Sequence, residues 1–168
     1  KENFDRPFSS RSVKEYWRRW HITMGTWFTD YIFYPLSVSV AMQKLSKWSR
    51  AHLGNALGKR IPVYLATIVT WFLTGLWHGA GWNFIVWGLL NCAAILISQE
   101  LQPLWDRFHR AAPRLSASGA WGCFQAIRTF LLMGLFRSLD VYRDVPRTFR
   151  LWGSMFTGGK WAELFTGG

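Results

Sequence analysis

The sequence predicts an all-α, polytopic integral membrane protein with transmembrane helices and interfacial amphipathic helices. No Asp, Glu, Lys or Arg occurs within residues 61–98. Trp is over-used, with 12 copies in 168 residues, as expected where indole rings lie at a membrane–water boundary. The formal charge of +11 is concentrated at residues 1–19, 44–60 and 107–114, next to apolar runs. This arrangement is typical of loops beside an anionic leaflet, so we expect a lipid bilayer and not nucleic acid as the partner.

Residues 12–34 predict an interfacial helix. Ser12 and Glu15 fit a capping box at its start. Apolar residues then recur at spacings of three and four: Val13, Trp17, Trp20, Met24, Trp27, Phe28 and Tyr31. Because the basic residues fall off this face, the helix is expected to lie in the headgroup plane. We expect Pro35 to end the regular segment.

Residues 61–98 predict a helical hairpin that carries His78. As one helix, this 38-residue stretch would be about 57 Å long, whereas the hydrocarbon core of a bilayer is ~30 Å thick. The stretch must therefore be folded or broken, and Gly75, Gly79 and Gly81 mark the break. Irregular backbone at membrane depth is tolerated where it is buried in protein or lines an aqueous cavity.

Further segments complete the expected topology. A short amphipathic helix near residues 42–53 precedes the hairpin, and both arms of the hairpin lead to basic segments. We therefore expect Arg60 and Arg107 on one cytoplasmic side.

Residues 121–139 predict a further span. Its Arg128 and Arg137 are expected to extend towards opposite interfaces. Residues 147–168 look amphipathic, with a turn at residues 158–159.

His78 is the leading candidate for a functional residue. It is the only side chain within residues 61–98 that titrates near neutral pH, and ionisable groups are costly in hydrocarbon. The alternative is a histidine that only hydrogen-bonds a neighbouring helix. Cys92 and Cys123 form no CxxC motif and have no Cys or His partner at metal-ligand spacing, so no metal site is expected.

Five runs of the sequence stand out: FDRPF (4–8), YWRRWHIT (16–23), TWFTDYIFYPL (26–36), LTGLWHGAGWNF (73–84) and the run 130–138 that ends in FRS. Together they resemble the membrane-bound O-acyltransferase family, in the branch of alginate O-acetyltransferases and teichoic acid D-alanyl transfer proteins. The fourth run resembles the branch's GLWHGAxWxF signature. The resemblance implies that residues 1–168 are the C-terminal part of one membrane domain. Thr29 departs from the Arg that is usual before Asp30.

The resemblance implies acyl transfer to a hydroxyl group. His78 would be the general base that takes the hydroxyl proton as the oxygen attacks a thioester carbonyl. His21, the other signature histidine, would orient groups, contact the donor or stabilise the oxyanion. No bound cofactor is expected. The donor substrate would be acyl-CoA, with acetyl-CoA as the first choice, or an acyl-carrier thioester.

Six more residues are candidates for substrate binding: Arg18, Arg19, Asp30, Trp77, Trp82 and Asn83. The arginines suit contact with a phosphate of the donor's carrier group. The carboxylate can orient an imidazole or pair with an arginine, and the amide can donate a hydrogen bond near the base. The two indoles flank the base and can exclude water. Packing, ion pairing and contact with lipid headgroups are the structural alternatives.

The predicted function is movement of an acyl group across a bacterial inner (plasma) membrane, in a multi-pass protein, for O-acylation of a cell-surface or exported polysaccharide. The expected partners are a polysaccharide acceptor or a periplasmic or extracellular acyltransferase, and an acyl carrier protein is a further candidate. The alternatives are D-alanyl transfer to teichoic acid, a transporter or channel lined by the hairpin, and a non-catalytic scaffold.

Overall fold

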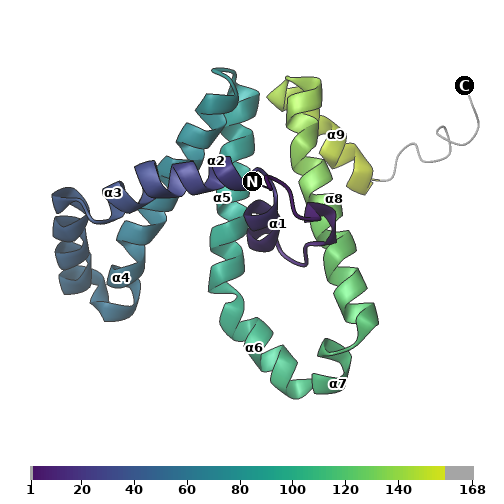
Figure 1. Cartoon of the computed structure of the whole chain (residues 1–168), viewed down its shortest axis with the longest axis horizontal. Coiled ribbons are helices and arrows are strands. Elements are labelled where there is room, and N and C mark those ends of the chain that lie inside the picture. Colours follow the sequence, from purple (N-terminus) through teal and green to yellow (C-terminus); the bar gives the residue numbers. More distant parts are fainter. Residues whose placement is uncertain (1, 158–168) are drawn as a thin grey trace, which may run out of the picture.

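The computed structural model describes residues 2–157, which are almost entirely helical (Figure 1). The elements are a 3-10 turn η1 (Pro7–Ser9), α1 (Val13–Arg19), α2 (Ile22–Phe28), a π-helix η2 (Thr29–Phe33), α3 (Tyr34–Ser37), α4 (Val40–His78), α5 (Trp82–Glu100), α6 (Gln102–Ala111), α7 (Pro113–Ser116), α8 (Gly119–Tyr142) and α9 (Val145–Thr157). The predicted all-α fold class is confirmed.

Within residues 2–157, α4 and α5 are the two helices long and apolar enough to cross a membrane. They pack against each other as a hairpin (Figure 1). At the open end of the hairpin, Arg60 lies 2.6 Å from a carboxylate oxygen of Glu100, and the Tyr64 hydroxyl donates to the other oxygen. These contacts fix the two ends of the hairpin side by side, at the end opposite His78.

The hairpin turn lies at residues 79–81, between the last residue of α4 and the first of α5. Gly79 is needed there because a Cβ atom would lie 2.6 Å from the ring of Phe84. Gly75 has a different role from the one expected, because it lies inside α4. A Cβ atom on Gly75 would lie 2.5 Å from the Phe84 carbonyl oxygen, so this glycine allows the two helices to approach closely.

The single helix expected over residues 12–34 is broken at Trp20 and His21. Trp20 is extended, and His21 is left-handed, with φ 48° and ψ 52°. The cause is the segment that precedes α1. The backbone oxygen of Asn3 accepts from the Ile22 amide at 3.0 Å, and the side-chain oxygen of Asn3 accepts from the Thr23 amide at 3.0 Å. This pairing competes with the helical hydrogen bonds and caps α2 instead.

Pro35 does not end the helical segment as expected, because it lies in the first turn of α3. The π-helix η2 directly precedes it, and the Tyr34 amide donates to the Thr29 carbonyl at the wider i to i+5 spacing. A wide turn of this kind accommodates the missing amide hydrogen and the ring of proline.

Helix α4 contains a kink at Gly54, where φ is 78°. The expected amphipathic helix near residues 42–53 forms the part before the kink. The Ser49 hydroxyl oxygen lies 2.9 Å from the Gly58 carbonyl oxygen. Pro62 cannot donate to this carbonyl because it has no amide hydrogen. The Ser49 hydroxyl, which also lies 2.7 Å from the Leu45 carbonyl oxygen, is a donor within reach of it.

Helix α8 covers the span predicted at residues 121–139, but it is not among the two helices of residues 2–157 that are apolar enough to cross a membrane. The charged residues of α8 are held by protein groups. Arg128 donates to the Arg11 carbonyl oxygen at 2.9 Å, and Arg137 lies 3.7 Å from Asp140. The amphipathic segment expected over residues 147–168 begins within α9, which ends at Thr157. The turn predicted at residues 158–159 lies outside the described residues.

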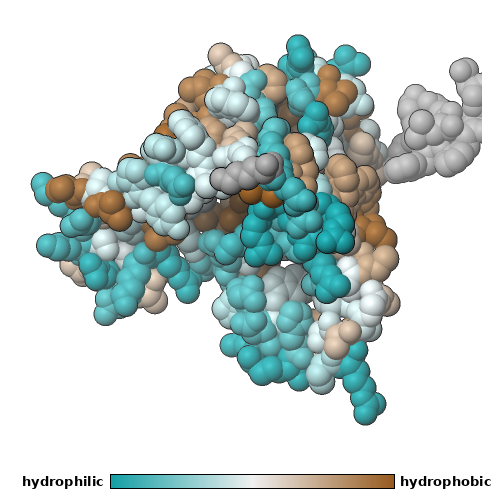
Figure 2. All heavy atoms as spheres, viewed as in Figure 1, coloured by the Kyte–Doolittle hydropathy of each residue, from teal (hydrophilic) through white to brown (hydrophobic). Residues whose placement is uncertain are grey.

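A small core forms where three distant elements meet. Val13 and Tyr16 of α1 pack with Ile95 of α5 and Met133 of α8. In Figure 1, α1 lies between α5 and α8. The surface in Figure 2 is hydrophobic over parts of the hairpin and α8, and it is mostly hydrophilic over α6 and α7. The N-terminal segment is therefore wedged between helices that are far apart in the sequence.

We expect Gly88→Ala to destabilise the protein, because a Cβ atom there would lie 2.5 Å from the Trp71 carbonyl oxygen. Overpacking of this kind costs about 1–3 kcal/mol. The measurement is the thermal unfolding midpoint of the full-length protein in detergent. Gly134→Ala is the matched control, since its Cβ atom meets nothing within 4 Å among residues 2–157. Equal midpoints for the two variants would contradict the close-approach role of Gly88.

Candidate functional site

His78 lies at the hairpin turn and lines a cavity of about 50 Å³. The other lining residues come from α1 and its C-cap, from α5 and from α8: Tyr16, Trp17, Trp20, Phe84, Trp87, Met133, Arg137 and Asp140. The His78 ring is 4.8 Å from the ring of Trp87 and 4.9 Å from that of Trp77, between centroids. His78 itself is exposed, so it remains reachable. A cavity of this size holds a few water-sized groups beside an imidazole.

Tyr16 contributes a neutral hydroxyl group to the same cavity. The residue is buried, and burial raises the pKa of its phenol, while the charge of Arg137 opposes this shift to a smaller extent. At neutral pH the phenol is therefore protonated and can donate a hydrogen bond.

His21 lies at the junction of α1 and α2 and lines a separate groove of about 440 Å³. The side-chain nitrogen of Asn3 lies 3.3 Å from Nδ1 of His21. The Asn3 side-chain oxygen accepts from the amide and the hydroxyl of Thr23, which fixes the orientation of the Asn3 amide group. Asn3 therefore donates to Nδ1, and a neutral His21 ring carries its proton on Nε2.

The two histidine motifs interlock although they are far apart in the sequence. Trp20, next to His21, lines the cavity of His78, and Trp77, next to His78, lines the groove of His21. The ring of Phe28 lies 6.4 Å from that of Trp77. The two imidazoles line different cavities.

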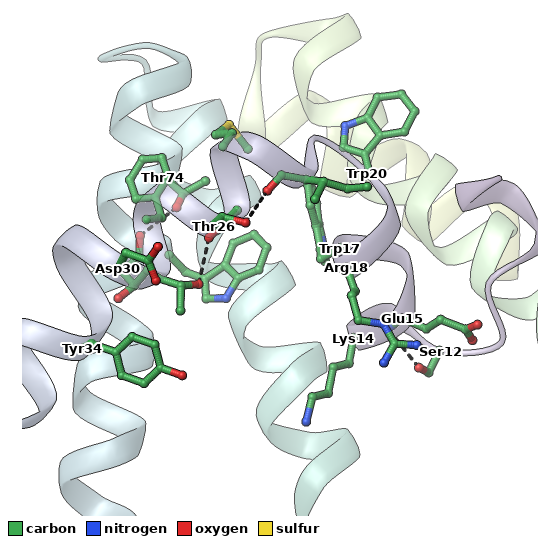
Figure 3. Close-up of a pocket in the computed structure, with 17 residues that line it drawn as sticks. Ser12, Lys14, Glu15, Trp17, Arg18, Trp20, Thr26, Asp30, Tyr34 and Thr74 are labelled. Atoms are coloured by element: carbon green, nitrogen blue, oxygen red, sulfur yellow. Dashed lines mark hydrogen bonds between the residues drawn. The ribbon is translucent and has the colours of Figure 1, made fainter. Parts of the chain in front are cut away.

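A larger cleft of about 1110 Å³ lies between α1 and the α2–η2 segment (Figure 3). Lys14 and Arg18 stand on one side of the cleft, and Asp30 and Tyr34 stand on the other (Figure 3). Trp17 lines both this cleft and the cavity of His78, as does Trp20. The cleft can therefore hold an extended ligand whose end points towards the base.

The structure separates the two predicted arginines. Arg18 lines the large cleft, whereas Arg19 is paired with Glu15 at 2.8 Å and donates to the Ser9 hydroxyl at 3.2 Å. Arg19 therefore has partners within the protein, and its contact with a phosphate stays a prediction. Asp30 lines the cleft but makes no ion pair with either arginine in the described part of the chain.

The residues that follow the hairpin turn also differ from each other. Trp82 is 75% exposed and lines none of the three cavities described above. Asn83 is only 6% exposed, and its side-chain nitrogen has no hydrogen-bond partner among residues 2–157. A buried amide donor without a partner is costly, so a group outside the described residues is expected to accept from it.

Four residues near the histidines were not predicted from the sequence: Asn3, Tyr16, Asp140 and, as a neighbour of His78, Arg137. Their contacts depend on the tertiary fold, so no spacing in the sequence indicated them. Within residues 2–157, no group of three His, Cys, Asp or Glu side chains is arranged to hold a metal ion.

A buried hydrogen bond positions the first histidine motif on the hairpin. The indole nitrogen of Trp17 donates to the side-chain oxygen of Asn91 at 3.0 Å, and the Asn91 amide donates to the Trp87 carbonyl at 2.8 Å. Asn91 is fully buried in α5. Since both polar groups of its side chain are satisfied, the contact is favourable inside an apolar environment.

No family model matches the chain. A probable alginate O-acetylase of Azotobacter vinelandii is 32% identical over 160 residues, which are 95% of this chain and 26% of that relative. A peptidoglycan O-acetyltransferase of Helicobacter pylori is 32% identical over 115 residues, or 68% of this chain and 19% of the relative. A teichoic acid D-alanyltransferase of Streptococcus thermophilus is 33% identical over 96 residues, or 57% and 21%. The chain thus spans about a quarter of the length of these relatives, or less.

The helices and the cavity around His78 define an all-α membrane protein with an ionisable group held at a break between two helices. The similarity to these relatives then specifies the family within this class of protein. The chain belongs to the membrane-bound O-acyltransferase family and matches a C-terminal portion of its members.

We expect Asn91→Leu and Trp17→Phe to destabilise the protein non-additively, because each leaves the other partner unpaired. The coupling energy should be about 0.5–1.5 kcal/mol. A double-mutant cycle on the unfolding free energy of the full-length protein measures it. Asn91→Leu combined with Trp152→Phe is the control pair, since the indole of Trp152 donates to Ser138 instead. Equal coupling in both cycles would contradict a specific Trp17–Asn91 bond.

Proposed function

We propose that the chain is part of a multi-pass acyltransferase of the bacterial inner membrane. It would move an acyl group, first of all acetyl, from a thioester donor for O-acylation of a cell-surface or exported polysaccharide. The observation that supports this most is the cavity in which His78 lies beside residues of the His21 motif. The names of the relatives, two O-acetyl-transferring proteins and one D-alanyltransferase, point to the same reaction type.

In this mechanism the His78 imidazole accepts the proton of the acceptor hydroxyl. The hydroxyl oxygen forms a bond to the thioester carbonyl carbon, and the carbon–sulfur bond then breaks. The thiolate that leaves takes the proton from the imidazolium, so His78 returns to its neutral form. A positioned general base contributes about 10²–10⁴-fold in rate.

The remaining site residues would bind and shield. The phenol of Tyr16, which lines the cavity of His78, would donate to the oxyanion, and the Nε2–H group of His21 in the neighbouring groove would contact the donor. Asn83 would donate its free amide near the base. Trp77 would exclude water from the thioester, whereas the exposure of Trp82 favours packing against a further part of the protein.

Lys14 and Arg18 would bind a phosphate of the donor's carrier group in the large cleft, with Asp30 on the opposite side. Neither cation makes an ion pair within residues 2–157, and both line the cleft that adjoins the base through Trp17. Acetyl-CoA and an acyl carrier protein both carry such a phosphate. The acceptor would be the polysaccharide or a periplasmic acyltransferase that passes the group on. D-alanyl transfer to teichoic acid is the second candidate, supported by the D-alanyltransferase relative.

His78→Ala in the full-length protein should lower O-acylation of the host's surface polysaccharide by about 10²–10⁴-fold, because the proton acceptor is lost. Mass spectrometry of the polysaccharide measures the acyl content. His109→Ala on α6 is the matched control, since this histidine lines none of the three cavities.

Wild-type acylation in the His78→Ala variant would refute the proposal. Normal acylation after replacement of both His21 and His78 would favour a scaffold, and solute flux without a thioester donor would favour a transporter.

Lys14→Gln and Arg18→Gln together should raise the KM for acetyl-CoA about 10-fold or more, with a smaller effect on kcat, because loss of two charge-assisted contacts weakens donor binding. Steady-state kinetics in nanodiscs give both constants. Lys44→Gln with Lys47→Gln is a control that removes equal charge outside the cleft. An unchanged KM for both acetyl-CoA and an acyl carrier protein would remove this cleft as the donor site.

A further inference from the structure

Helix α8 brings a charged pair to the cavity of His78. Met133, Arg137 and Asp140 recur at spacings of four and three, so they share one face of the helix, and all three line the cavity. Leu139 is fully buried, and its packing fixes the orientation of α8 about its own axis. The position of Asp140 beside the cavity is therefore set by the packing of α8.

Stability does not account for this carboxylate. Its one ion pair among residues 2–157 is with Arg137, at 3.7 Å, and the Arg137 side chain is 67% exposed. Exposed ion pairs on a helix contribute little to stability. A carboxylate at the edge of an aromatic cavity is also costly to desolvate. Its presence there calls for a role in the cavity.

The residues that line the cavity of His78 differ in whether they can stabilise a positive charge on its imidazole. Tyr16 on α1 is neutral, and Arg137 is a cation, so neither residue can stabilise a positive charge on His78. Asp140 is the one acidic residue among the described residues that line the cavity. When His78 becomes an imidazolium, Asp140 is thus the lining residue whose charge can stabilise it.

We infer that Asp140 is a positioning residue for His78, whose carboxylate orients the imidazole and stabilises the imidazolium formed when the acceptor hydroxyl loses its proton. This inference rests on the proposed function. Asp140 takes no proton itself, because the proton passes from the hydroxyl to His78 and then to the thiolate that leaves. Its contribution is therefore made to the chemical step and not to donor binding.

The test uses the full-length protein in nanodiscs, with acetyl-CoA as donor and the polysaccharide of the host as acceptor. Asp140→Asn should lower kcat about 10- to 100-fold, the range known for carboxylates that orient metal-bound imidazoles, and leave the KM for acetyl-CoA unchanged. Asp140→Glu should recover part of the lost kcat, since it restores the charge. Asp144→Asn is the matched control, because Asp144 lies outside the cavity and caps the Arg147 amide at 2.8 Å, which Asn does equally well.

A double variant that exchanges the two charges, Arg137→Asp with Asp140→Arg, distinguishes an effect of the charge near His78 on activity from an effect on stability. It keeps opposite charges three residues apart, so the unfolding midpoint should be retained while kcat falls at least as far as in Asp140→Asn. An unchanged kcat in Asp140→Asn, or a change in KM alone, would overturn the inference and leave the proposed function standing if His78→Ala is inactive. An active His78→Ala variant would instead refute the proposed function.

Discussion

The hydrogen bond between Trp17 and Asn91 is the contact on which the site depends. It joins the short helix α1 to the middle of the hairpin helix α5, in an apolar environment where an unpaired indole or amide would be costly. Because α1 is held there, Trp17 and Trp20 become walls of the cavity around His78. One polar contact thereby connects a segment that could otherwise lie free at the interface to the helix break.

The fold class and the hairpin could be predicted because they are local properties of the chain. A charge-free stretch longer than a bilayer is thick must turn, and the glycines at residues 79–81 locate the turn. Gly75 shows the limit of this reasoning. A glycine near a turn can permit a bend or a close helix contact, and only the position of Phe84 on the facing helix distinguishes the two.

The rest of the site depends on contacts between distant segments. Apolar residues recur at helical spacing through residues 12–34, which predicts one helix. Asn3, however, accepts a hydrogen bond from the Ile22 amide, and this contact interrupts the helix. Arg19 and Arg18 are neighbours in the sequence, yet only one faces the cleft, because Glu15 pairs with the other. No pattern in the sequence predicts that Asp140 shares a cavity with His78. The two residues line one cavity because α8 packs on α1 and α5.

The backbone at His21 limits which amino acids this position tolerates. A left-handed conformation costs most residues about 1–2 kcal/mol, and Gly, Asn, Asp and His are the types that adopt it most readily. The backbone conformation therefore limits which substitutions of His21 the fold tolerates, apart from any role in chemistry. Of the residue types that adopt this conformation readily, Asn also carries a side-chain N–H donor. A related protein could thus exchange an imidazole for an amide here without rebuilding the bend.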